Sequence, residues 1–448
     1  MEEFIIKTAQ LILGLSLLII LHELGHFIPA KLFKTRVEKF FLFFDYKFAL
    51  FKFRIGETVY GMGWIPLGGY VKIAGMIDES MDTDQMDKEP EPWEFRTKPA
   101  WQRLIIMLGG VFVNLILAMA IYAGILFTWG EKYIPNENLT GGVWVRDSLA
   151  YDLGLRSGDH ILQINDQKID RFTDILPNMI LGGEMQVRHE NGQQETMEIP
   201  QDFIGKLIDN PTKAVIFYRV PFIIGGIPDS SHNVNSGIQL KDLITGVNGV
   251  DLPWWDQYAD HLKQFAGQEV TLNVMRDGEA LEIPVKLNDA GQIGVMLYPP
   301  STDDLERLGI YQFETQEYGF FESIPAGINK GVEQVGSYLS QLKMIFTPST
   351  GAYKGVGGFK AIWDLYPPEW EWQVFWTMTA FLSVMLAVLN LLPIPALDGG
   401  HVMFTLWEII TGRKPGDKFM EYAQIFGLFI ILALFLFANG NDIFRMFK

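Results

Sequence analysis

The sequence predicts a polytopic α-helical membrane protein of about four spans, with a β-rich loop after the first span and two copies of a small β-rich module. The 448-residue chain is 48% hydrophobic with a mean hydropathy of +0.13, a balance typical of a protein that is partly membrane-embedded and partly aqueous. Several apolar stretches approach the length of a membrane span, and a long acidic middle region contains an internal repeat.

The apolar stretches define the membrane organisation. A helix needs about 20 residues to cross the hydrocarbon core. The candidates are Phe4 to Phe33, Leu104 to Trp129, Val374 to Ala396 and Ala423 to Ala438, of which the last is the shortest. We do not expect the first to be a cleaved signal peptide, because Met1-Glu2-Glu3 is acidic where a signal peptide is basic.

Lys and Arg residues gather after the first span, before the second span, and between the third and fourth. Positively charged loops remain in the cytosol, so we expect both termini and the region 130–370 to lie outside. Most of the net charge of −17 lies in that region, which argues against nucleic acid as a partner. The chain has no cysteine, which excludes disulfides and thiolate ligands.

Three ionisable residues, His22, Glu23 and His26, interrupt the apolar first span. On a helix the two histidines project from one face and can bind one metal ion, while Glu23 lies beside that face, where it can take a proton from water. The alternative is a helix end at the membrane surface with ordinary polar caps. Because an unpartnered charge at membrane depth costs several kcal/mol, we expect a zinc site.

The loop after the first span contains three β-prone segments, Phe48–Phe53, Thr58–Trp64 and Gly69–Ile73. The stretch from Tyr60 to Lys72 is punctuated by glycines and predicts a hairpin-like element. Its edge either pairs with an extended peptide or belongs to a small sheet that only covers the helix ends. The polar, acidic stretch Asp78–Pro92 predicts a mobile linker.

The second span carries Gly109-Gly110 ahead of Asn114, a small-then-polar pattern that lets membrane helices approach and hydrogen-bond. We expect the glycines to serve helix packing. Asn114 either links helices by hydrogen bonding or lies near the metal site, and we favour the first role.

Two prolines and two glycines break the end of the third span, between Asn390 and His401. Irregular backbone at membrane depth is tolerated where it faces protein or a water-filled cavity. Catalytic zinc takes three protein ligands, and Asp398 and His401 are the candidates to complete the set begun by the first span. The alternative makes Asp398 a helix cap and His401 an interfacial histidine.

The acidic region repeats one pattern, at residues 154–165 and again at 237–248. Each copy is followed by a hairpin turn, Asn191-Gly192 or Asp277-Gly278, so two copies of one β-rich module are predicted. We expect the histidines of this region to be surface residues: His160, His189, His232 and His261. Beyond the repeats, Ile324–Phe346 predicts an amphipathic helix at the membrane surface.

Taken together, these features resemble the site-2 protease family of intramembrane zinc metalloproteases, and specifically its bacterial RseP type. The resemblance covers essentially the whole chain. It rests on four elements in the family's order: His22 to His26, Ile65 to Lys72, tandem PDZ-like repeats, and Asn390 to Pro393 followed by Leu397 to His401.

By position, the resemblance implies roles for individual residues. It selects Asp398 over His401 and gives three Zn²⁺ ligands: His22, His26 and Asp398. It makes Glu23 the catalytic base, and Asn390 the residue that positions the substrate or stabilises the developing oxyanion. It also implies a segment that binds the unwound substrate as an added strand: Gly68, Gly69, Tyr70 and Val71.

The resemblance further implies an enzyme that cleaves the transmembrane segment of single-span substrates, such as anti-sigma factors or signal-peptide remnants, in regulated intramembrane proteolysis. Such an enzyme is a multi-pass protein of the bacterial inner membrane, surrounded by the lipid bilayer. Its active site faces the cytosolic side, and its PDZ-like domains lie outside, where they bind peptides or exclude bulky substrates. The alternative is a non-catalytic membrane scaffold with a structural metal, against which the intact Glu23 argues.

The sequence departs from the family pattern at two places. In the second repeat Lys241 stands where the first has Gly158, which puts peptide binding by the second module in doubt. Leu108-Gly109-Gly110-Val111 stands where family members usually have Ala-Gly-Pro.

These features divide the chain into consecutive parts. They are the first span (1–35), the β-loop and linker (36–100), the second span (101–130), the first PDZ-like domain (131–210), the second PDZ-like domain (211–300), a linker with the amphipathic helix (301–370), and the third and fourth spans (371–448).

Overall fold

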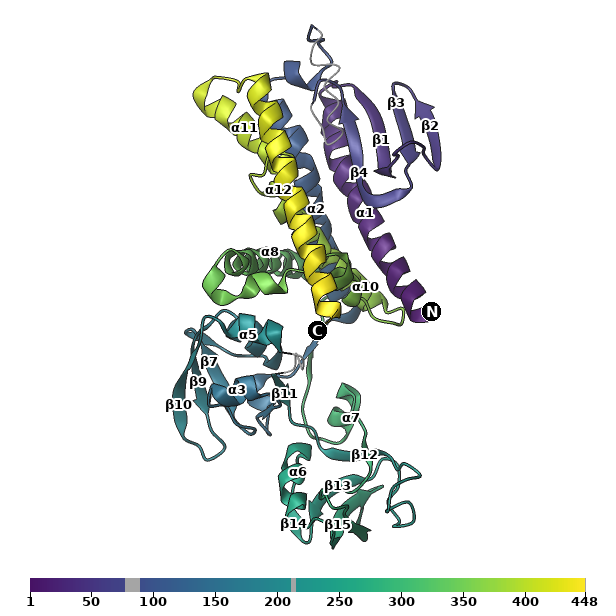
Figure 1. Ribbon diagram of the computed structural model, residues 1–448, viewed down its shortest axis with the longest axis vertical. Helices are drawn as coiled ribbons and strands as arrows, with labels where there is room; N and C mark the ends of the chain where they lie inside the picture. Colours follow the sequence, from purple (N-terminus) through teal and green to yellow (C-terminus); the bar gives the residue numbers. More distant parts are fainter. Residues whose placement is uncertain (77–88, 211–214, 448) are drawn as a thin grey trace. The chain divides into compact units, whose positions relative to one another are not determined.

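The computed structural model describes residues 1–76, 89–210 and 215–447 (Figure 1). The chain forms two compact units. The first comprises Met1–Gly130, Glu317–Lys343 and Val356–Lys448, and the second comprises Glu131–Gln316 and Met344–Gly355. Of the predicted linker Asp78–Pro92, residues 78–88 lie outside the described part of the chain.

Four helices of the first unit are long and apolar enough to cross a membrane, as the sequence predicts. They are α1 (Glu2–Leu32), α2 (Ala100–Trp129), α10 (Trp372–Leu391) and α12 (Asp417–Met446). The third ends before the predicted Ala396, because Pro393 and Pro395 interrupt the helical hydrogen bonding. A separate helix, α11 (Asp398–Thr411), follows the break.

The fourth helix is longer than its predicted apolar core, Ala423–Ala438, because polar residues near its C-terminal end remain helical and bind a neighbouring helix. The Asp442 carboxylate accepts hydrogen bonds from the backbone N–H groups of Gly358 at 2.9 Å and Lys360 at 3.1 Å. Both N–H groups lie at the N-terminal end of α9 (Phe359–Asp364). The C-terminal end of α12 therefore caps α9.

The β-rich loop forms a four-stranded sheet beside α1 (Figure 1). Its strands are β1 (Val37–Phe44), β2 (Phe51–Ile55), β3 (Thr58–Met62) and β4 (Ile65–Ile73), in the order β2-β3-β1-β4. The expectation of a hairpin between Tyr60 and Lys72 is wrong, because β1 lies between β3 and β4, parallel to β3 and antiparallel to β4. Among the described residues, β4 is an outer strand of this sheet.

The predicted amphipathic segment is helical and forms α8 (Phe320–Ile345). Gly327 brings α8 against the backbone of α2, since a side chain at this position would overlap Ala123. Elsewhere on its surface α8 exposes large apolar side chains, including Phe321 and Val332.

The second unit contains two β-rich modules with separate hydrophobic cores. The sheet of the first has the order β10-β9-β7-β8, from β7 (His160–Ile164), β8 (Gln167–Lys168), β9 (Gly183–Arg188) and β10 (Gln194–Ile199). The sheet of the second has the order β16-β15-β13-β12-β17, with β14 beside β13. It is built from β12 (Phe222–Gly226), β13 (Leu243–Val247), β14 (Val250–Asp251), β15 (Glu269–Arg276), β16 (Glu279–Lys286) and β17 (Met296–Leu297).

The repeat in the sequence corresponds to a repeat in the strand pairing. Residues 154–165 contain β7 and residues 237–248 contain β13. Each of these strands pairs antiparallel with a later strand that turns through a hairpin into the next. The prediction of two copies of one module is therefore confirmed.

Shorter elements complete the second unit. Two strand pairs join distant segments: β5 (Glu131–Tyr133) with β18 (Glu314–Gln316), and β6 (Val143–Val145) with β11 (Ile216–Tyr218). The helices are α3 (Ser148–Asp152), α4 (Ile175–Met179), α5 (Phe203–Asp209), α6 (Trp255–Lys263) and α7 (Thr302–Arg307). Leu305 and Tyr311 are buried in the first core, so the chain returns to the first module after completing the second.

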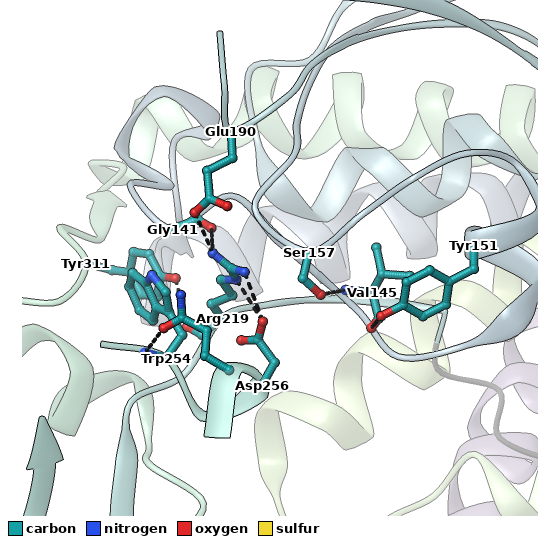
Figure 2. A network of polar contacts seen from close by, with 10 residues as sticks. Gly141, Val145, Tyr151, Ser157, Glu190, Arg219, Trp254, Asp256 and Tyr311 are labelled. Atoms are coloured by element: carbon teal, nitrogen blue, oxygen red, sulfur yellow. Dashed lines mark hydrogen bonds and ion pairs between the residues drawn. The ribbon is translucent and has the colours of Figure 1, made fainter. Parts of the chain in front are cut away.

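A buried arginine connects the two modules (Figure 2). Arg219 lies between β11 and β12, and its guanidinium is 3.3 Å from Glu190 of the first module and 2.9 Å from Asp256 at the start of α6. Its backbone oxygen accepts a hydrogen bond from the Tyr311 hydroxyl at 2.7 Å. Trp254 packs against Gly141, where a Cβ atom would lie 2.5 Å from the indole.

The two modules hold equivalent buried aspartates with different cations. In the first, His189 Nδ1 lies 2.9 Å from Asp159, and its Nε2 lies 3.2 Å from Glu195. In the second, Arg276 Nε lies 2.7 Å from Asp242, which corresponds to Asp159 in the repeat. His189 is therefore not a simple surface residue as expected. His160 and His261 are also half-buried, whereas His232 is exposed.

Hydrogen bonds to Asp159 and Glu195 raise the pKa of His189 above its ordinary value of 6.5. Because the folded-state pKa is raised, the stabilisation from this pair is complete below pH 6.5 and is lost as pH rises through the raised pKa. We therefore expect hydrogen-exchange protection of β7 and β9, measured by mass spectrometry on the full chain, to fall severalfold more than that of β13 and β15 between about pH 6 and about pH 9.

His189→Arg is the matched control for this prediction, since it copies the pair formed by Arg276 and should remove the pH dependence. Equal pH dependence in both modules of the wild type would contradict it.

Candidate metal centre

His22, His26 and Asp398 form a compact cluster of potential metal ligands. Asp398 Oδ2 lies 3.2 Å from His22 Nε2 and 3.3 Å from His26 Nε2, and the two Nε2 atoms are 3.2 Å apart. Two ligand atoms that are each about 2.0 Å from a tetrahedral zinc ion are about 3.3 Å apart. The donor atoms and their separations therefore fit three of the four ligands of a zinc site.

Helical periodicity and a chain reversal assemble this cluster. His22 and His26 occupy consecutive turns of α1. Asp398 is the first residue of α11, and Gly399 lets α11 fold back on the end of α10, because a side chain there would overlap the backbone oxygen of Leu392. The separate helix α11 is what brings Asp398 to the two histidines.

Glycines allow α1 and α2 to meet at the cluster. A Cβ atom at Gly25 would overlap the backbone of Gly109, and one at Gly109 would overlap the backbone of Gly25. A Cβ atom at Gly110 would overlap His26 Nε2 and lie 2.6 Å from His22 Cε1. The expectation that Gly109-Gly110 serves helix packing is confirmed, and Gly110 also leaves space for both imidazoles.

Hydrogen bonds to α2 and α10 orient the imidazoles. His26 Nδ1 lies 2.8 Å from the backbone oxygen of Ile106. His22 contacts two asparagines, with Asn114 Nδ2 at 3.3 Å from its Nδ1 and Asn390 Nδ2 at 3.2 Å from its Nε2. Asn114 therefore lies at the cluster, and its backbone oxygen also accepts a hydrogen bond from Ser383 of α10 at 2.8 Å. Asn114 thus links α2 to α1 and to α10, as we favoured from the sequence, and the alternative position near the metal site is found as well.

A cavity of about 340 Å³ opens beside the cluster. Glu23 and Asn390 line it, and so do three of the predicted strand residues, Gly69, Tyr70 and Val71. Gly68 precedes them in β4 and is not among the lining residues. The cavity thus brings the candidate base, the metal cluster and an outer strand together.

His401 lines the same cavity but lies outside the three-residue cluster. Its Nε2 is 3.0 Å from Gln424 Nε2 of α12. Gln424, Leu428 and Ile431 make α12 one wall of the cavity. The sequence analysis did not select these residues, although a glutamine within an apolar span was a signal that could have identified the contact.

Comparisons with known proteins find similar sequences over nearly the whole chain. The model of peptidase family M50 matches residues 10–434. A Neisseria meningitidis protein named "Putative zinc metalloprotease" is 26% identical over 459 residues, covering 97% of this chain and 98% of that protein. The regulator of sigma E protease of Haemophilus influenzae is 26% identical over 477 residues, covering 99% and 100% of the two chains.

Among solved structures, the PDZ domain of an SdrC-like protein from Listeria monocytogenes matches 20% of this chain and 94% of its own length, at 21% identity and with a TM-score of 0.16.

The space left by Gly110 leads to a prediction. Gly110→Ala should displace the imidazoles and lower zinc affinity by at least about tenfold, because a Cβ atom would occupy the position of His26 Nε2. Gly124→Ala is the matched control on the same helix, since nothing lies within 4 Å of the added atom. Competition with a chromophoric chelator measures the affinity. Unchanged zinc binding in Gly110→Ala would contradict the observed packing.

Proposed function

The chain belongs to peptidase family M50, and on this premise we propose which of its residues carry out proteolysis and on which substrates. The protein is a zinc-dependent intramembrane metalloprotease that acts in regulated proteolysis. We propose that His22, His26 and Asp398 hold the zinc ion. The observation that carries this proposal is the set of 3.2–3.3 Å separations between their three donor atoms.

Zinc bound at this site supplies Lewis acidity, which makes water a nucleophile at neutral pH and polarises the scissile carbonyl. Glu23 acts as the base that accepts the proton of the attacking water and returns it to the leaving amine. Three observations support this role. Glu23 follows His22 directly and lines the cavity, and its Cγ faces β4, 3.5 Å from where a Cβ atom of Gly69 would lie.

We propose that β4 binds the substrate as an added strand. A transmembrane helix hides its carbonyl groups in its own hydrogen bonds, so it must unwind before it is cut, and the freed groups then need partners. Because β4 has a strand neighbour only at β1 among the described residues, its other edge can supply them. Gly69 lets β4 pack closely against α1 beside Glu23, because a Cβ atom at this position would lie 2.6 Å from the Ile19 side chain.

Asn390 is the proposed donor to the substrate carbonyl. It lies at the end of α10, lines the cavity, and holds its amide nitrogen 3.2 Å from His22 Nε2. A donor in this position meets the carbonyl oxygen of a peptide bond that is bound next to the metal ligands, where negative charge develops.

The proposed substrates are the transmembrane segments of single-span proteins, of the anti-sigma-factor or signal-peptide-remnant type. The name of the Haemophilus influenzae relative, regulator of sigma E protease, supports the first type. The Lys and Arg distribution supports an orientation in the bacterial inner membrane with the active site toward the cytosol and the second unit outside. There its PDZ-like modules bind peptides or exclude substrates with large outer domains.

Glu23→Gln tests the proposed base. We expect it to lower cleavage of a tagged single-span reporter in proteoliposomes by about 10²–10⁴-fold, with zinc still bound, because the amide cannot accept the proton. Glu3→Gln is the matched control on α1 and should cleave like the wild type, since Glu3 pairs with Lys7 far from the cluster. Persistent cleavage by Glu23→Gln would remove this residue from the mechanism.

Consecutive proline substitutions test the proposed strand. Along an outer strand the N–H groups alternate between the paired side and the open side. We therefore expect one of Tyr70→Pro and Val71→Pro to lose reporter cleavage at least about tenfold while keeping zinc and thermal stability, and the other to destabilise the sheet. Cleavage at the wild-type rate by both variants would exclude strand addition at β4.

A further inference from the structure

We propose that Asn114 is a positioning residue, whose amide oxygen accepts the Nδ1–H of His22 and so fixes this imidazole with Nε2 directed at the zinc site. The inference rests on the proposed role of His22 as a zinc ligand. It assigns to α2 a direct part in building a site whose ligands all come from α1 and α11.

The tautomer of His22 that can bind a metal ion requires a hydrogen-bond acceptor at Nδ1. Its Nε2 is 3.2 Å from both Asp398 Oδ2 and His26 Nε2, so this nitrogen faces the cluster and must present its lone pair to bind a metal ion. A neutral imidazole then carries its proton on Nδ1. The group next to Nδ1 is the Asn114 amide, whose nearer atom is placed as nitrogen at 3.3 Å. Two donors cannot form a hydrogen bond.

A half-turn of the Asn114 amide resolves this contact. The side chain is fully buried, and in the present orientation its Oδ1 has no hydrogen-bond partner among the described residues. Turning the amide exchanges two atoms of nearly equal size and brings this oxygen to Nδ1–H. Before the turn the amide oxygen, the amide NH2 and the ring N–H all lack a partner at this contact, whereas after the turn only the amide NH2 does.

The second histidine is held in the same way by the same helix. His26 Nδ1 lies 2.8 Å from the backbone oxygen of Ile106, which can only accept. His26 Nδ1 therefore carries the proton, and its Nε2 faces the cluster with a free lone pair, as Nε2 of His22 does. A hydrogen bond from the non-ligating nitrogen orients metal-bound histidines generally and raises their basicity. Ile106 and Asn114 both lie on α2, and together they supply an acceptor to each imidazole.

The contribution of Asn114 to helix packing can be separated from this role. Ser383 of α10 donates to the backbone oxygen of Asn114, which every substitution at position 114 retains. Ser383→Ala removes this link between α2 and α10 and leaves the amide in place. It is therefore the control for a purely structural effect.

The test measures zinc affinity of the full-length protein in detergent, by competition with a chromophoric chelator, for Asn114→Leu and Asn114→Asp. Removal of the acceptor in Asn114→Leu should weaken zinc binding by about 10- to 100-fold and alter the visible spectrum of the Co²⁺-loaded protein. Asn114→Asp retains an acceptor and no donor, so it should bind zinc within a few-fold of the wild type. Ser383→Ala should bind zinc like the wild type.

Wild-type affinity in Asn114→Leu would overturn the proposal, as would an Asn114→Asp variant that binds zinc as weakly as Asn114→Leu. If Asn114→Leu fails to fold, Asn114→Ala replaces it, because alanine also lacks the acceptor and should weaken zinc binding in the same way. His22→Ala distinguishes a failure of the proposed ligand set from a failure of the positioning role of Asn114. Full zinc affinity in His22→Ala would refute the proposed ligand set, whereas its loss together with an unaffected Asn114→Leu would refute only the positioning role.

Discussion

The backbone contact between α1 and α2 is the constraint on which the site depends. Gly25 and Gly109 allow the two helices to touch without intervening side chains, and Gly110 leaves the space that both imidazoles occupy. In lipid, such close approach is the main source of helix association, because apolar side chains gain little by leaving an apolar solvent. The same contact that holds the helices together therefore brings α2 close enough to orient the histidines of α1.

Polar groups at membrane depth are costly, and the groups of the cluster lie against one another and against polar groups of α2 and α10. The imidazoles contact Asp398, two asparagines and a backbone oxygen of α2. The break after α10 also serves the site, because it turns the chain so that α11 begins with Asp398, the third candidate ligand and the acidic member of the cluster. The cavity beside the cluster then places an outer strand next to Glu23. Metal binding, proton transfer and strand binding thus use adjacent parts of one unit.

Local patterns in the sequence predicted much of this arrangement. Hydropathy located the spans, and helical spacing placed His22 and His26 on one face. Asp398 lies too far along the chain for spacing to select it over His401, so the choice needed the family resemblance. The strand order was missed because β1 (Val37–Phe44) ends in a run of apolar residues without the alternation of a half-buried strand, and because its pairing is non-local. The contact of Asn114 with His22 depends on how two helices rotate against each other, which no pattern within α2 shows.

Zinc K-edge X-ray absorption of the purified full-length protein tests whether two imidazoles and one carboxylate of this chain hold the zinc ion. We expect a four-coordinate shell of N and O atoms at about 2.0 Å, with multiple scattering from two imidazoles, and the loss of one O ligand in Asp398→Ala. A shell with one imidazole or none, or a spectrum that Asp398→Ala leaves unchanged, would contradict it.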